Sequence, residues 1–445
     1  MRFYLLSLGC PKNLVESEGM RELLRQAGYQ SADHPENAGI LIVNTCGFID
    51  RAKEESVATL RELGETKRPD QYLVAAGCMA ERYGGEMRQM VPSLDGIIGT
   101  QRWTEIAQLA ESLLTDHRPG ALHQLPQPGA SHPVIHPLPR HCPGLATAYV
   151  KIAEGCDAPC AFCAIPQIKG TFRSKPKEAI LTEVRQLVQQ DVREIILIAQ
   201  DITAYGRDRG ERDALPSLIG DILTTVPTLH WLRLMYTYPQ HVTPRLIETM
   251  VSNPQICHYL DLPLQHAHPD VLRRMNRPHH MGKIRSLMAR LRQAMPDIAL
   301  RTSFIVGYPG ETEEEFEGLL EFMKQAQFDR VGIFTYSQEE GTNAARLPDQ
   351  VPDNVKQDRY ELAMALQQSI SWRKNEDFVG QQLEVLIEGV GDGISVGRSY
   401  RDAPEVDGMV LIERELPVGE FCWVKIRTAL EYDLVGEPAE SPWKR

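Results

Sequence analysis

The chain has 445 residues, of which 42% are hydrophobic and 24% are charged. These proportions are ordinary for globular proteins and exclude a disordered, collagen-like or disulfide-framework chain. The length predicts about three domains. No run of about eighteen apolar residues occurs, so we expect no membrane span. The first ten residues contain one Arg and a very short apolar run, which argues against a secretory signal and for a cytoplasmic protein.

Charge and cysteine content narrow the function classes. The formal net charge is −12, from 48 Lys and Arg against 60 Asp and Glu. Because phosphate binding favours a basic surface, this balance argues against a nucleic-acid partner. The nine cysteines are too few for a secreted disulfide scaffold. In a reducing compartment, clustered cysteines instead indicate a metal site or a catalytic site.

Residues 1–114 alternate predicted strands and helices. RFYLLSLG, GILIVNT, QYLVAAG and DGIIGT are short apolar runs, and each is followed by a segment with helical periodicity. Such alternation predicts a parallel α/β sheet domain. Residues 115–141 hold six Pro and five His without periodicity, which predicts a linker. These His residues could bind a metal, but their irregular spacing favours solvated linker residues.

Residues 142–377 alternate again, through six predicted strand–helix units and one long closing helix. Six units predict a (β/α)6-type fold, a partial or full barrel whose chemistry lies at the C-terminal ends of the strands. From residue 378 the chain changes to short apolar runs separated by Gly and Pro turns. Residues 378–445 therefore predict a small antiparallel β-barrel.

The strongest local signal is the trio Cys156, Cys160 and Cys163, just after the first predicted strand of the 142–377 segment. Three thiolates with the spacing C-x3-C-x2-C can hold three irons of a cubane cluster. Because cluster binding normally takes four cysteines, an outside ligand must complete the fourth iron. A zinc site is the alternative, with Cys142 as the fourth ligand. Zinc ligands commonly occur in C-x2-C pairs, and Cys142 has no second cysteine near it in the sequence.

A second trio is spread along the chain, at Cys10, Cys46 and Cys78. Each residue ends a predicted parallel strand and opens the following helix. Strand C-termini share one edge of an open α/β sheet, so the three can converge there, and helix N-termini favour thiolates. Three buried structural cysteines are the alternative. The remaining cysteines have no such partners and are expected to be packing residues: Cys142, Cys257 and Cys422.

Two cysteine trios in this order, followed by a small β-barrel, resemble the methylthiotransferases of the radical S-adenosylmethionine superfamily. The likeness covers nearly the whole chain, through the motifs LGCPKN, VNTCGFI, AAGCMAERY, GCDAPCAFCAIPQIKG and IVGYPGETEEEF. It implies an N-terminal methylthiotransferase domain at 1–114, a radical S-adenosylmethionine core at 142–377 and a C-terminal TRAM domain at 378–445.

The resemblance also implies the reaction and its cofactors. Such enzymes replace an unactivated C–H hydrogen with a methylthio group, using one S-adenosylmethionine as methyl donor and another as the source of a 5'-deoxyadenosyl radical. The protein holds, orients and dries the site, and the cofactors supply the difficult chemistry. Two 4Fe-4S clusters are implied, a sulfur-carrying one at Cys10, Cys46 and Cys78 and a radical-generating one at Cys156, Cys160 and Cys163.

The resemblance further implies S-adenosylmethionine contacts at the ends of three core strands. These residues are Gln200 and Asp201 after the second strand, Gln265 after the fourth, and Ile305, Gly307 and Pro309 after the fifth. For Gly307 and Pro309, an ordinary turn between strand and helix is an equal alternative. Many members of the family carry Arg where this chain has Lys169, so no role is assigned to that position. No general base is identified.

The family has two main branches, one acting on an adenosine of tRNA and one on the β-carbon of an aspartate in ribosomal protein S12. Residues 376–445 hold seven Lys and Arg against fifteen Asp and Glu, whereas a barrel that grips tRNA should be basic. An acidic barrel favours a basic ribosomal protein, and a merely soluble acidic surface is the alternative. Asp157 agrees, because the tRNA branch usually has Asn there.

The segment 268–296 points the other way, with seven Lys and Arg against one acid, Asp270. It could touch RNA, but the solvated outer face of a helix explains it better. We therefore expect the ribosomal-protein branch, with tRNA methylthiolation as the alternative enzyme. A non-catalytic iron–sulfur electron carrier is the alternative from a different class. The sequence identifies neither the electron donor nor the sulfur source, nor whether free S12 or a ribosomal particle is the substrate.

Overall fold

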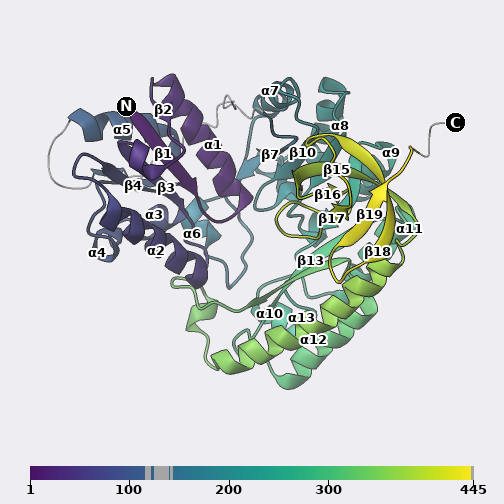
Figure 1. Cartoon of the computed structure of the whole chain (residues 1–445). Coiled ribbons are helices and arrows are strands. Elements are labelled where there is room, and N and C mark those ends of the chain that lie inside the picture. Colours follow the sequence, from purple (N-terminus) through teal and green to yellow (C-terminus); the bar gives the residue numbers. More distant parts are fainter. Residues whose placement is uncertain (116–121, 125–139, 141–143, 442–445) are drawn as a thin grey trace.

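A computed structural model describes residues 1–115, 122–124, 140 and 144–441. The chain forms an N-terminal unit up to residue 124, a central unit from 144 to 376, and a C-terminal barrel from 382 to 438. The N-terminal unit and the barrel both lie against the central unit (Figure 1). No described helix combines the length and apolar composition needed to cross a membrane.

The N-terminal unit is a parallel sheet with the strand order β2-β1-β3-β4-β5-β6. All six residues of β3 are buried, and alternate residues enter different cores: Ile40 faces the core under α1 and α5, and Leu41 the core under α2. Burial on both faces explains the continuous apolar runs. The strands are β1 (Arg2–Ser7), β2 (Gln30–Ser31), β3 (Ile40–Thr45), β4 (Tyr72–Gly77), β5 (Gly96–Gly99) and β6 (Leu122–Gln124). The helices are α1 (Pro11–Gln26), α2 (Asp50–Thr66), α3 (Cys78–Tyr83), α4 (Met87–Met90) and α5 (Ile106–Thr115).

This sheet is larger than predicted, because the sequence indicated four strands and the structure adds β2 and β6. Strand β6 falls inside the segment 115–141 that was predicted as a linker, and it pairs with β5. The sheet therefore continues past residue 114. Most of the Pro- and His-rich segment lies outside the described residues, and so does Cys142, which follows it.

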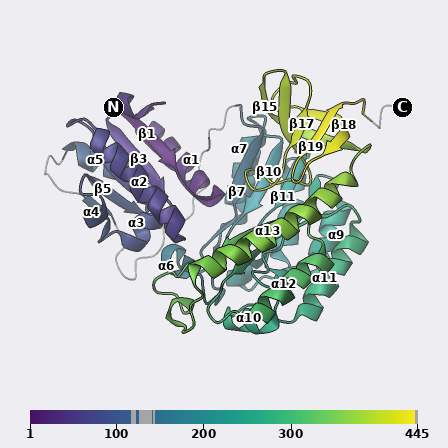
Figure 2. The ribbon, with the colours of Figure 1, turned by 60° about the horizontal axis from the view of Figure 1, so that its bottom comes forward.

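The central unit is a second parallel sheet, with the order β14-β13-β12-β11-β10-β7. Within the described residues β7 and β14 do not pair with each other, so this is the partial form of the predicted barrel. Helices α12 and α13 lie side by side on its outer surface (Figure 2). The strands are β7 (Thr147–Lys151), β10 (Glu194–Ile198), β11 (Trp231–Leu234), β12 (Ile256–Asp261), β13 (Ala299–Val306) and β14 (Arg330–Thr335). The helices are α6 (Ile165–Lys169), α7 (Lys177–Val188), α8 (Ala214–Thr225), α9 (Pro244–Ser252), α10 (Pro269–Arg274), α11 (Met281–Ala294), α12 (Glu313–Ala326) and α13 (Asp353–Glu376).

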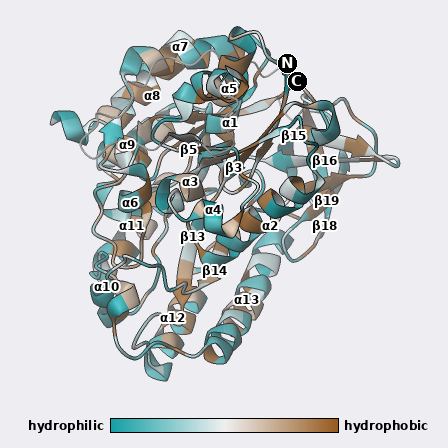
Figure 3. Ribbon diagram, turned by 90° about the vertical axis from the view of Figure 1, so that its left-hand side faces the viewer, coloured by the Kyte–Doolittle hydropathy of each residue, from teal (hydrophilic) through white to brown (hydrophobic). Residues whose placement is uncertain are grey.

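Amphipathic helices cover this sheet, as the sequence period predicts. Helix α12 buries Phe316, Leu319 and Met323 on one side. Its ribbon carries both hydrophilic and hydrophobic colours (Figure 3). Helix α11 buries Ile284 and Leu291 in the same core. Its basic residues Lys283, Arg285 and Arg290 are exposed, so the basic segment 268–296 contains the solvated helix face that was expected.

The C-terminal barrel is closed, with the order β15-β16-β17-β19-β18. The pair β17–β19 is parallel and the other pairs are antiparallel. A closed barrel with an odd number of strands cannot alternate direction throughout, which is why the wholly antiparallel prediction fails at one pair. The strands are β15 (Gln382–Gly391), β16 (Ile394–Ser399), β17 (Val410–Ile412), β18 (Phe421–Ala429) and β19 (Leu434–Pro438).

Buried ion pairs join the barrel to the central sheet. Glu194 at the start of β10 lies 2.6 Å from Arg398 of β16 and 2.7 Å from Arg233 of β11. Burial alone would raise the pKa of Glu194, but the two guanidinium groups outweigh it and lower the pKa to about 2. Because removing one member of a buried pair leaves an uncompensated charge, these contacts fix where the barrel sits.

Candidate functional site

The predicted core trio lies on one loop between the short strand β8 (Ala153–Glu154) and α6. The loop closes on itself through hydrogen bonds from Cys163 N to Cys160 O (3.2 Å) and from Cys156 N to Gly170 O (3.1 Å). A Cβ at Gly155 would lie 2.1 Å from the Thr171 carbonyl oxygen, so glycine is required for this close approach. All three cysteines are half-buried. The C-x3-C-x2-C spacing is therefore folded into a compact, partly accessible set of thiols.

Polar side chains support this loop. The Asp157 carboxylate accepts the Phe172 N–H (2.9 Å), which holds the loop to the chain that returns after α6. Arg277 Nη1 lies 3.6 Å from Cys160 Sγ. Burial raises the pKa of the Cys163 thiol to about 12. A buried guanidinium beside half-buried sulfurs suits a group that binds the thiols as thiolates and carries negative charge.

The N-terminal trio converges at one edge of its sheet. Cys10, Cys46 and Cys78 follow the C-terminal ends of β1, β3 and β4, which are neighbouring parallel strands. A Cβ at Gly9 would lie 2.7 Å from Cys46 Cβ, and a Cβ at Gly47 would lie 3.1 Å from the carbonyl carbon of Cys78. The three loops therefore touch one another, as the predicted convergence requires.

Asn13 clamps these three loops, a role that the sequence did not indicate. Its Nδ2 donates to the carbonyl oxygens of Leu8 (3.1 Å) and Thr45 (3.0 Å). Its Oδ1 lies 3.4 Å from Cys78 Sγ and accepts the thiol hydrogen. Asn13 is fully buried, so this amide holds the segments before Cys10 and Cys46 against Cys78.

One prediction about this trio is wrong. Cys10 is the N-cap of α1 and Cys78 begins α3, but α2 begins only at Asp50, so Cys46 does not open a helix. Burial raises the pKa of the Cys46 and Cys78 thiols. Loss of solvation therefore disfavours the thiolate at both residues, and at Cys46 there is no helix end to oppose it.

The two trios lie on facing sides of the interface between the N-terminal and central units. Cys78 shares a small buried cluster with Ala164 and Ile168, on the segment that directly follows Cys163. Next to it, Glu16 of α1 forms buried ion pairs with Lys151 and Lys169 of the central unit. Lys169, to which no role was assigned, is thus part of the contact that holds the two trios opposite each other.

The distances between the sulfur atoms help to decide whether each trio fits a zinc ion or an iron–sulfur cluster. Among the described residues, the one group of three His, Cys, Asp or Glu ligand atoms within 4.8 Å of one another is His268, Asp270 and Glu315. Neither cysteine trio is that tight, whereas a zinc ion with sulfur ligands at about 2.3 Å would draw three sulfurs closer. The donor sets, three thiols each, fit a larger cubane cluster with one iron left to an outside ligand.

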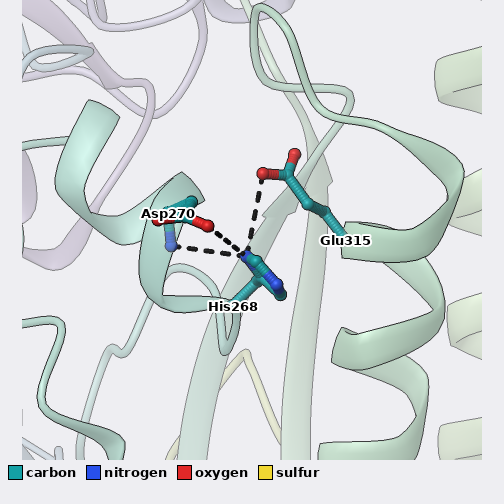
Figure 4. Close-up of side chains that lie close together, drawn as sticks. All are labelled: His268, Asp270 and Glu315. Atoms are coloured by element: carbon teal, nitrogen blue, oxygen red, sulfur yellow. Dashed lines mark hydrogen bonds and ion pairs between the residues drawn. The ribbon is translucent and has the colours of Figure 1, made fainter.

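The group at His268 does not resemble a metal site (Figure 4). His268 Nδ1 accepts the Asp270 N–H (3.3 Å) as the N-cap of α10. Arg274 pairs with Glu315 at 2.6 Å, and Arg273 pairs with Asp270. Both carboxylates are already paired with arginines, so they are not free to bind a metal. The group instead caps α10 through His268 and joins α10 to α12 through Arg274 and Glu315.

The predicted cofactor contacts gather at the C-terminal ends of β10, β12 and β13, the same edge as the core trio. Asp201 is buried, and its carboxylate accepts the Thr203 N–H (2.9 Å) and lies 3.0 Å from His241 Nδ1. It therefore shapes its own loop. Gln200 is half-buried beside it. Whether either touches a cofactor stays a prediction.

The segments after β12 and β13 contain positive φ values and close contacts. Gln265 has a φ of +75° and accepts the Ile305 N–H (2.7 Å), which extends the strand pairing of β12 and β13. Gly307 has a φ of +72°, and a Cβ there would lie 2.3 Å from Lys356 Cγ. Pro309 is buried, and Ile305 packs against the apolar cluster that contains Ala161 of the cysteine loop.

Two cysteines outside the trios pack as expected. Cys257 is buried in the cluster on the concave side of the central sheet, and Cys422 packs against the barrel core. Cys142 lies outside the described residues.

Comparison with known proteins places the chain in a family. Three family models match successive parts of it: Uncharacterized protein family UPF0004 at residues 2–99, the Radical SAM superfamily at 150–323 and the TRAM domain at 379–438. Ribosomal protein uS12 methylthiotransferase RimO of Herpetosiphon aurantiacus is 47% identical, over 98% of this chain and 100% of the relative. RimO of Chloroflexus aurantiacus is 48% identical, over 98% of this chain and 99% of the relative. The chain belongs to the ribosomal protein uS12 methylthiotransferase family.

Solved structures show the fold that this methylthiotransferase family shares with others. The radical S-adenosylmethionine methyltransferase TsrM of Kitasatospora setae, solved with cobalamin and a 4Fe-4S cluster, has a TM-score of 0.55. It is 13% identical and the match covers 91% of this chain and 82% of TsrM. At that identity the likeness concerns the fold alone. The chain is a radical S-adenosylmethionine methylthiotransferase by its family, and its predicted three-part architecture is confirmed.

Proposed function

We propose that this chain transfers a methylthio group to the β-carbon of an aspartyl residue in ribosomal protein uS12. The relatives that match it over nearly its full length carry the name of that activity. The observation that carries the proposal is the facing arrangement of the two cysteine trios, because Cys78 packs beside Ala164, the residue after Cys163. A simple methyltransferase needs no second set of three thiols.

We assign a 4Fe-4S cluster to each trio, one held by Cys10, Cys46 and Cys78 and one by Cys156, Cys160 and Cys163. We assign S-adenosylmethionine to the residues at the strand ends: Gln200, Asp201, Gln265, Ile305, Gly307 and Pro309. When bound, these groups supply the radical, the methyl group and the sulfur.

The chain's own residues hold this chemistry in register. Asn13 keeps the three N-terminal loops together, and Asp157 fixes the core loop. Arg277 brings a positive charge to Cys160. Glu16 ties the N-terminal unit to Lys151 and Lys169. All these groups except Asp157 are largely buried.

The barrel surface supports a basic protein as substrate. Two of the barrel's arginines, Arg398 and Arg401, are buried, so they do not contribute to the exposed charge. Within the described part of 376–445, the exposed bases are Arg414 and Arg427. The exposed acids there are Glu376, Asp377, Glu388, Asp392, Glu405, Glu413, Glu415, Glu420, Glu431, Glu437 and Glu440. Such a surface attracts a basic ribosomal protein and repels tRNA phosphates.

Mass spectrometry of uS12 tests this function. Cells that lack the enzyme should contain uS12 lighter by one methylthio group, and restoring the wild-type chain should return that mass. A chain with Cys160→Ala should not restore it, because the core trio is incomplete. An unchanged uS12 mass together with loss of a methylthio group from tRNA adenosine would assign the chain to the tRNA branch instead.

A further inference from the structure

Lys12 stands out as a buried cation outside the ion pairs described above. It lies in the first turn of α1, two residues after Cys10, and is 6% exposed. Its Nζ lies 3.0 Å from the centroid of the Tyr236 ring. Among the residues that the structure describes, none forms an ion pair or a hydrogen bond with this ammonium group. The aromatic face is therefore its one close partner there.

Burial of an ammonium group without an anion is costly, and a cation–π contact offsets only part of that cost. The groups whose negative charge acts on Lys12 are Cys10, which acts most strongly, and the Asp261 carboxylate. Both of its oxygens are committed elsewhere: Oδ1 lies 3.0 Å from Arg301 Nη1, and Oδ2 accepts the Tyr236 N–H at 3.1 Å. The like charges of Lys151 and Lys169 also act on Lys12. Asp261 is therefore not free to pair with Lys12, so the ammonium group beside Cys10 can bind an anion that enters from outside.

Lys12 also lies at the position where the N-terminal trio meets the reactive edge of the central sheet. Tyr236 is the second residue after β11, and its carbonyl oxygen accepts the Ile202 N–H (3.1 Å), next to the predicted cofactor contact Asp201. Tyr236 has a φ of +64°, a strained conformation for an aromatic residue. Strain of this kind is retained where the position of a side chain matters.

We propose that Lys12 binds the side-chain carboxylate of the substrate aspartyl residue and thereby selects aspartate over its uncharged analogue. This proposal rests on the proposed function, in which the carbon that receives sulfur is bonded to that carboxylate carbon. Tyr236 positions the ammonium group, and Lys12 presents it next to Cys10. A charge-assisted hydrogen bond in a dry site discriminates more strongly than the same contact in water.

The test compares two forms of uS12, one with the natural target aspartate and one in which asparagine replaces it. Equilibrium binding of each form is measured on the reconstituted holoenzyme, for the wild type, Lys12→Met and Lys12→Arg. The wild type should bind the aspartate form roughly tenfold or more tightly than the asparagine form. Lys12→Met should bind both alike, and Lys12→Arg should keep part of the preference. The matched control Lys283→Met, on the exposed face of α11, should behave as the wild type.

Iron content and cofactor cleavage without uS12 are measured on the same samples. Both should be unchanged in Lys12→Met. A preference for aspartate that survives in Lys12→Met overturns the proposal, and so does a loss of iron, because Lys12 would then support the N-terminal cluster. If the wild type neither binds nor modifies the aspartate form, the proposed function itself fails. If it modifies uS12 and the preference persists without Lys12, only this inference fails.

Discussion

Glu16 of α1 and Lys169 of α6 form a buried ion pair across the interface between the N-terminal and central units. Lys151 shares the same carboxylate at 2.9 Å, and Thr100 donates to it at 2.8 Å. Burial alone would raise the pKa of Glu16, but the two lysines lower it to about 2. One carboxylate thus holds two cations from the opposite unit, and this contact sets the alignment of the cysteine trios.

Replacing this carboxylate should separate the units. Glu16→Gln leaves Lys151 and Lys169 buried as neighbouring like charges, so the interface should lose about 3–5 kcal/mol. Chemical denaturation should show an earlier first transition, and methylthiolation should fall while cofactor cleavage persists. The control Glu62→Gln, on the exposed side of α2, should change neither. Equal denaturation curves for Glu16→Gln and wild type would show that the pair does not hold the interface.

The two trios should be functionally separable. Cys46→Ala removes a thiol from the N-terminal trio alone, so methylthiolation should be lost while some S-adenosylmethionine cleavage remains. Cys160→Ala should abolish both, because it interrupts the trio assigned to the radical step. Cys422→Ala, in the barrel, serves as the control and should retain both activities. Product analysis by mass spectrometry measures each step, and methylthiolated product from either trio variant would contradict the assignment.

Arg277 should raise the reduction potential of the cluster proposed at the core trio. Its guanidinium lies 3.6 Å from Cys160 Sγ and 4.3 Å from the Tyr238 ring centroid, and its other nitrogen donates to the Pro263 carbonyl. Removing this positive charge makes addition of an electron harder. Arg277→Met should therefore lower the cluster's reduction potential, on the order of tens of millivolts. A redox titration followed by electron spin resonance measures it, with Arg285→Met on the exposed face of α11 as the control. A potential that stays the same or rises would speak against a cluster at Cys160.

Acid should weaken the contact between the barrel and the central sheet. The pKa of Glu194 is about 2 in the folded protein, below the ordinary value of 4.5 for a glutamate side chain. A carboxyl with a lowered pKa stabilises the fold above its unfolded pKa, and that stabilisation disappears as pH falls from about 4.5 towards 2. The contribution is on the order of 3 kcal/mol. The difference in unfolding free energy between wild type and Glu194→Gln should therefore shrink over that pH range. A constant difference, as expected for the exposed control Glu431→Gln, would contradict the linkage.

Much of the fold follows from the sequence because both parallel sheets are buried on both faces and read as apolar runs. Strands β2, β6 and β9 (Arg173–Ser174) were missed, since two or three residues cannot show a period, and β8 (Ala153–Glu154) was predicted as the end of the first core strand. The convergence of the N-terminal cysteines was predictable from topology, because parallel strands end at one edge. Single polar residues on helices were not predictable: Asn13 and Glu16 find their partners Thr45 and Lys169 only in three dimensions.

Iron and sulfide counting after anaerobic reconstitution tests the two-cluster site most directly. The wild type is compared with a triple variant in which Cys10, Cys46 and Cys78 are all replaced by alanine. Two separate cubane clusters predict about eight irons in the wild type and about four in the triple variant, with matching sulfide. A wild-type count of about four, or an unchanged count in the triple variant, would contradict a cluster on the N-terminal trio.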